Sequence, residues 1–126
     1  MYVYLAWFNV AFIVVMLMPY LLKKLGKSQM KKDGFRKALK AFRAIHRPLG
    51  ALVLIVGGTH GYLALGGTLR LNTTGTVLWG VLIVTGVFGG AYALSKNRTV
   101  FKVHKFMALL VVVSFFYHYL LPGPVI

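Results

Sequence analysis

The sequence contains no cysteine and only one acidic residue, Asp33. The lack of cysteine excludes disulfides, thiolate metal sites and the C-x-x-C-H motif for covalent cofactor attachment. A single carboxylate cannot supply a catalytic pair of acids, and the sequence has no phosphate-binding glycine motif and no arrangement that would activate a nucleophile. These absences exclude nucleophilic and paired-carboxylate catalysis.

Apolar residues dominate instead: 59% of the 126 residues are hydrophobic. This composition is typical of an integral membrane protein. Four apolar segments, residues 2–22, 44–66, 76–95 and 101–121, are about long enough to cross a hydrocarbon layer roughly 30 Å thick. We therefore predict an all-α fold, a membrane four-helix bundle that forms one domain over residues 1–126. Because no basic region precedes the first apolar run, we interpret residues 2–22 as a retained span rather than a signal peptide.

The charge is strongly positive and unevenly distributed. The formal net charge is +14, and ten of the fifteen basic residues lie between Lys23 and Arg47. Arg70 is alone in the second connection, and four more cations surround the third: Lys96, Arg98, Lys102 and Lys105. Since Lys and Arg accumulate in cytoplasmic loops, we predict that the first and third connections are cytoplasmic and that both termini lie outside. The distribution favours membrane lipid over nucleic acid as the partner of this charge, with an acidic protein as the alternative.

The segment before the second span, residues 34–47, is amphipathic. Its apolar residues recur at helical spacing between basic ones: Phe35, Leu39, Phe42 and Ile45. The pattern predicts either a cytoplasmic extension of the second span or a helix on the membrane surface. Pro48 removes one backbone hydrogen bond, so we expect a bend there.

The four histidines form two matched pairs. His46 and His60 are 14 residues apart, His104 and His118 are also 14 apart, and the second pair follows the first at an offset of 58. Their neighbours are alike as well, AIHR against KVHK and THGYL against YHYLL. We interpret the chain as two repeated helical hairpins, the first with a longer loop. The spans 44–66 and 101–121 then cross the membrane in the same direction.

Helical geometry places both histidines of one span on the same face. Fourteen residues rise about 21 Å and turn about 1400°, roughly 40° short of four turns. Pairing the two spans sets His46 opposite His104 on the cytoplasmic side and His60 opposite His118 on the outer side. A lone histidine at a membrane boundary is often only an interfacial polar residue. Two equal intervals that use all four histidines favour paired metal ligands instead.

Two imidazoles facing each other across a bundle provide the axial ligands of a six-coordinate haem. The candidate partners of the haem propionates are Arg43, Arg47, Lys102 and Lys105 on the cytoplasmic side, and Arg70 with Asn72 outside. Conjugated rings bound at both levels would let electrons tunnel across the bilayer.

Glycines provide a second indication. Gly50, Val53 and Gly57 share the helical face of His46, and the missing side chains would let a flat ring approach the helix. Close helix–helix packing is the alternative explanation. The corresponding positions of the fourth span are Ala108, Val111 and Phe115, of which Phe115 lies either between the rings or in ordinary packing.

The motif H-x13-H on two spans, at His46/His60 and His104/His118, resembles the dihaem b-type transmembrane cytochromes. It is similar to the cytochrome b core of quinol-oxidising complexes and to the ferric-reductase-like transmembrane domain. The resemblance implies two noncovalent haem b groups, each ligated by one histidine from each of two helices. This chain departs from those families because it lacks a flavin and nicotinamide module, additional spans and the carboxylates of a quinone pocket.

The sequence therefore predicts transmembrane electron transfer through two bis-histidine haems, with a quinol or a protein as donor or acceptor. The alternative is a membrane oxidoreductase acting on quinone, superoxide or a ferric substrate, with Tyr62, Tyr117 or Tyr119 as candidate bases. A divalent-metal transporter and a purely structural anchor are further hypotheses that explain the pattern less well. We expect a location in a prokaryotic cytoplasmic membrane, as a homodimer or as a subunit of a larger redox complex.

Overall fold

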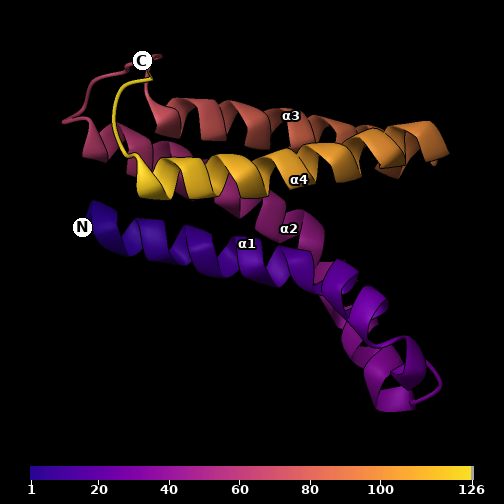
Figure 1. Ribbon diagram of the computed structural model, residues 1–126. Helices are drawn as coiled ribbons and strands as arrows, with labels where there is room; N and C mark the ends of the chain where they lie inside the picture. Colours follow the sequence, from indigo (N-terminus) through magenta and orange to yellow (C-terminus); the bar gives the residue numbers. More distant parts are fainter. Residues whose placement is uncertain (126) are drawn as a thin grey trace. The chain divides into compact units, whose positions relative to one another are not determined.

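The computed structural model describes residues 1–125 and is all-α (Figure 1). Its elements are α1 (Tyr2–Leu25), a 3-10 turn η1 (Lys27–Gln29), α2 (Asp33–Ala64), α3 (Thr74–Ser95) and α4 (Arg98–Leu120). Apart from one isolated bridge between Thr73 and Pro124, these residues contain no β-structure. The predicted fold class is confirmed at this level.

Three helices are long and apolar enough to cross a membrane: α1, α3 and α4. Of the remaining predicted span, residues 44–66, the part up to Ala64 forms the C-terminal part of α2, and its passage through the membrane stays a prediction. The amphipathic segment before it belongs to the same helix, which begins at Asp33. Pro48 lies inside α2 without ending it, since one missing N–H removes only one bond of a long helix.

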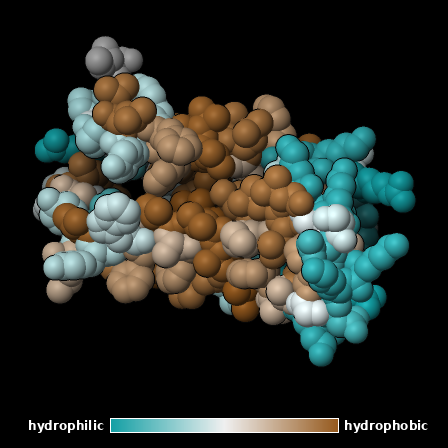
Figure 2. Space-filling model, turned by 60° about the horizontal axis from the view of Figure 1, so that its bottom comes forward, coloured by the Kyte–Doolittle hydropathy of each residue, from teal (hydrophilic) through white to brown (hydrophobic). Residues whose placement is uncertain are grey.

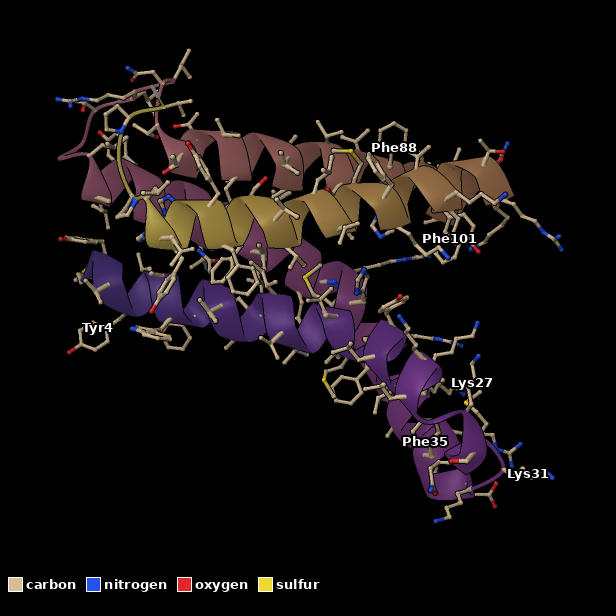
Figure 3. All side chains as sticks on the ribbon, in the orientation of Figure 1. Tyr4, Lys27, Lys31, Phe35, Phe88 and Phe101 are labelled. Atoms are coloured by element: carbon tan, nitrogen blue, oxygen red, sulfur yellow. The ribbon has the colours of Figure 1, made fainter. Side chains whose placement is uncertain are left out.

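The chain divides into two compact units, Met1–Gly57 and the residues from Gly58 onward. In the first unit, the end of α1 turns through η1 into α2. The ring of Phe35 lies against Gly26, beside the turn that carries Lys27 and Lys31 (Figure 3). Leu39 of α2 is only 4% exposed. The ten basic residues between Lys23 and Arg47 are all exposed, and Asp33 pairs with Arg36.

The second unit is built on the antiparallel hairpin of α3 and α4, which pack together along their length (Figure 1). Both helices begin with a side-chain cap, because Thr73 accepts from Thr76 N–H and Asn97 accepts from Thr99 N–H. After α4 the chain folds back onto the start of α3, where the Thr74 N–H donates to the Gly123 carbonyl over 2.9 Å. This return closes the end of the hairpin that carries His118.

Large apolar side chains are exposed on the helices. Trp7 of α1 is 63% exposed, and Phe106 and Leu109 of α4 are each 59% exposed. Much of the surface in view in Figure 2 is brown, the colour of hydrophobic residues. Such surfaces suit hydrocarbon rather than water.

Candidate functional site

All four histidines lie on two helices and all are partly buried. His46 and His60 belong to α2, and His104 and His118 belong to α4. His46 lies in the first compact unit and the other three lie in the second.

His104 is held by the backbone of α3. Its Nδ1 lies 2.9 Å from the carbonyl oxygen of Thr85. A carbonyl can only accept, so the ring donates Nδ1–H. In a neutral imidazole this places the lone pair on Nε2. The Thr85 hydroxyl takes no part in this bond, because it donates to the carbonyl of Val81 over 2.7 Å.

His118 is held by a side chain of α3. Its Nδ1 lies 2.9 Å from Oγ1 of Thr74, which is only 2% exposed. The same hydroxyl donates to the carbonyl of Leu121 over 3.2 Å. We assign the single hydrogen of this hydroxyl to the Leu121 carbonyl, which can only accept, so that Oγ1 accepts from the ring. His118 is therefore also the Nδ1–H tautomer, with the lone pair on Nε2.

His46 shows the same arrangement in the first unit. Its Nδ1 lies 3.2 Å from the carbonyl oxygen of Met16 in α1, so this ring too donates Nδ1–H. Pro19 interrupts the backbone hydrogen bonds of α1 next to this carbonyl. A β-carbon added at Gly50 would lie 3.5 Å from Met16 Cε, an ordinary contact. Gly50 therefore faces α1, as the packing explanation expects.

His60 belongs to the second unit, as His118 does. This part of α2 also contacts α3, since a β-carbon at Gly58 would lie 3.3 Å from the Trp79 ring. One predicted pair of histidines, His60 and His118, therefore lies within one compact unit.

Burial repeats at the offset of the histidines. Val53 of α2 is 1% exposed and Val111 of α4 is 5% exposed, and they are the most buried residues of the two predicted histidine spans. Each lies halfway between the two histidines of its helix, and they differ by 58 positions. Their burial agrees with the predicted face in both helices.

The other predicted site residues lie at the surface or on the helix. The predicted propionate partners are exposed: Arg43, Arg47, Arg70, Lys102 and Lys105. The ammonium of Lys105 lies 5.2 Å from the ring centroid of Phe101. Asn72 accepts from Val125 N–H through its main chain, and Gly57 lies within α2. Phe115 stacks on Tyr119 at 6.2 Å between ring centroids.

Sequence reasoning missed the residues of α3 that contact the histidines. Besides Thr74 and Thr85, these are two glycines. A β-carbon at Gly75 would lie 3.1 Å from Cε1 of His118, and one at Gly89 would lie 3.0 Å from Cε1 of His104. Gly75 and Gly89 are 14 residues apart, the interval of the histidines. That shared interval is the signal that could have identified them.

Within residues 1–125, no three His, Cys, Asp or Glu side chains gather into a group that could hold a metal ion. Haem iron takes only two side-chain ligands in a bis-histidine site, so this finding does not bear on such a site. The chain matches no protein-family model, no curated protein and no solved structure.

Proposed function

We propose that this chain is a dihaem b-type cytochrome that transfers electrons across a membrane. One observation carries the proposal: three histidine rings are each hydrogen-bonded through Nδ1 to the preceding helix. The acceptor is a main-chain carbonyl for His46 and His104 and a threonine hydroxyl for His118. Metal-binding histidines almost always donate the second ring N–H in this way, because the bond orients the ring and makes the ligating nitrogen more basic. The equal spacing of the four histidines gives each haem one ligand from α2 and one from α4.

The residues of the chain fit this cofactor by their chemistry. Haem, when bound, carries one electron by alternating between ferric and ferrous iron. The four histidines would hold the haem iron of the two groups, and the iron would then carry electrons rather than bind a substrate. The apolar helices exclude water, and the exposed cations provide partners for the propionates. A direct substrate role of the iron is therefore less favoured than electron transfer.

The proposal includes the location of the protein. Helices α1, α3 and α4 are apolar enough to cross a membrane, and we propose that α2 supplies the fourth span. The basic connections would then face the cytoplasm and the termini the outside, with a quinol or protein as redox partner.

Absorbance spectroscopy tests this function. The full chain, expressed with sufficient haem and purified in detergent, should change its spectrum on dithionite reduction as a low-spin b-type cytochrome does. His104→Ala and His118→Ala should each lose redox-active haem, whereas Val113→Ala, at a 58% exposed position of α4, should not. If each of the four His→Ala variants kept the haem spectrum of the wild type, the proposal would be overturned.

A further inference from the structure

Helix α3 carries no predicted haem ligand, yet it holds both histidines of α4. Each α4 ring donates Nδ1–H to α3, His104 to Thr85 and His118 to Thr74. Each ring also passes close to an α3 glycine, Gly89 or Gly75. The contacts occur at two levels of the hairpin: the two glycines are 14 residues apart on α3, as the two histidines are on α4, and the two threonines are 11 apart.

The glycine at the His104 level has a geometric reason. In a helix, residue 89 stacks one turn beyond residue 85, and its Cα–Cβ bond would lean back toward that residue. A side chain at position 89 would therefore crowd the ring that reaches the Thr85 carbonyl. The separation of 3.0 Å between a built β-carbon and His104 Cε1 measures this crowding.

The acceptors at the two levels differ in kind. At His104 the acceptor is a main-chain carbonyl, which no substitution of Thr85 removes. At His118 the acceptor is the hydroxyl of Thr74, a buried side chain whose own hydrogen is committed to Leu121. Only the second contact can be deleted by changing one side chain.

We infer that Thr74 is a positioning residue that fixes the ring orientation and the Nδ1–H tautomer of His118, so that Nε2 is presented as the ligand. Thr85 serves His104 through its backbone alone. The assignment of this role to haem ligation rests on the proposed function, whereas the tautomer itself does not. Two threonines on one helix thus have different consequences when their hydroxyls are removed.

Nitrogen NMR of the haem-free full chain in detergent, labelled with 15N-histidine, tests the tautomer directly. His104 and His118 should both show a protonated Nδ1 and an unprotonated Nε2. Thr74→Val should shift His118 toward the Nε2–H form and leave His104 unchanged, and Thr74→Ser should restore the wild-type signals. Thr85→Val, the matched control, should change neither ring. An unchanged His118 in Thr74→Val, or an Nε2–H tautomer of His118 in the wild type, would overturn the inference.

Haem binding provides the second readout. A lost outer hydrogen bond weakens metal binding about 10- to 100-fold. Thr74→Val should therefore weaken one haem site by this factor and raise the reduction potential of that haem alone, because a less basic ligand stabilises ferric iron less. Equal losses at both sites would contradict the inference. If no variant binds haem but the tautomers respond as described, the proposed function fails and the role of Thr74 stands.

A buried position carries a risk of misfolding. Should Thr74→Val fail to fold, Thr74→Ala removes the same hydroxyl with a smaller side chain. Thr74→Ala should shift His118 toward the Nε2–H form as well. If His118 shifts in Thr74→Ala and not in Thr74→Ser, the inference holds; if it shifts in neither variant, the inference is overturned.

Discussion

The two helical hairpins of the chain hold their first histidine by the same kind of bond. His46 of α2 donates to the Met16 carbonyl of α1 over 3.2 Å, and His104 of α4 donates to the Thr85 carbonyl of α3 over 2.9 Å. In each hairpin, therefore, the histidine helix bonds the backbone of the helix before it. This likeness, with the equivalent burial of Val53 and Val111, supports the interpretation of the chain as a repeat.

The two hairpins differ in which helix contributes a glycine to the contact between the helices. Helix α3 presents Gly89 to the His104 ring, and in residues 1–125 α3 with α4 is the closely packed helix pair. Helix α1 has no glycine, and Gly50 of α2 meets Met16 instead. A glycine opposite the histidine lets the ring come close to the backbone. The comparison indicates that α3 is adapted to its histidines at the level of single side chains.

Among these substitutions, we expect a change of Gly89 to have the largest effect on haem binding. In Gly89→Ala the His104 ring must move by a few tenths of an ångström, which lengthens its bond to Thr85. We expect about tenfold weaker haem binding at one site. The helix itself should gain up to about 1 kcal/mol from alanine. Haem titration together with thermal unfolding separates the two effects.

Gly90→Ala is the control for this substitution. A β-carbon at Gly90 would meet no atom within 4 Å, so only the helix should gain. Equal haem binding in the two variants would show that Gly89 does not control the position of the ring.

Substitution of the buried valines tests whether the two hairpins are equivalent, with a smaller expected effect on stability. Val53→Ala and Val111→Ala each leave a small cavity at the same place in a hairpin, and each should lower the free energy of unfolding by on the order of 1 kcal/mol. Val113→Ala should have almost no effect, because that side chain is 58% exposed. Denaturation in detergent measures the three values. A large loss for only one of the two buried valines would argue against equivalent roles.

The sequence predicted the elements better than the contacts between them. Long apolar runs locate α1, α3 and α4, since few other structures bury so many consecutive apolar residues. The start of α2 at Asp33, before the predicted span, follows from an amphipathic segment whose two possible placements composition could not separate. The return of the chain after Leu121 onto Thr73 and Thr74 left no pattern in the sequence, because backbone groups make it.

The same limit explains which site residues were found. Histidines are rare in apolar spans, so their interval was visible. Helix α3 is apolar on all sides, and such a helix has no polar face to show how it is rotated. For that reason Thr74 could not be assigned to the histidines before the packing of α3 on α4 was known, and only the 14-residue interval pointed to Gly75 and Gly89.

Haem stoichiometry tests the central claim most directly. The full chain, purified after haem-replete expression, should contain two noncovalent haem b groups per polypeptide by the pyridine haemochrome assay, one for each pair of its four histidines. A colourless polypeptide, or the same haem content after all four histidines are replaced, would contradict the account.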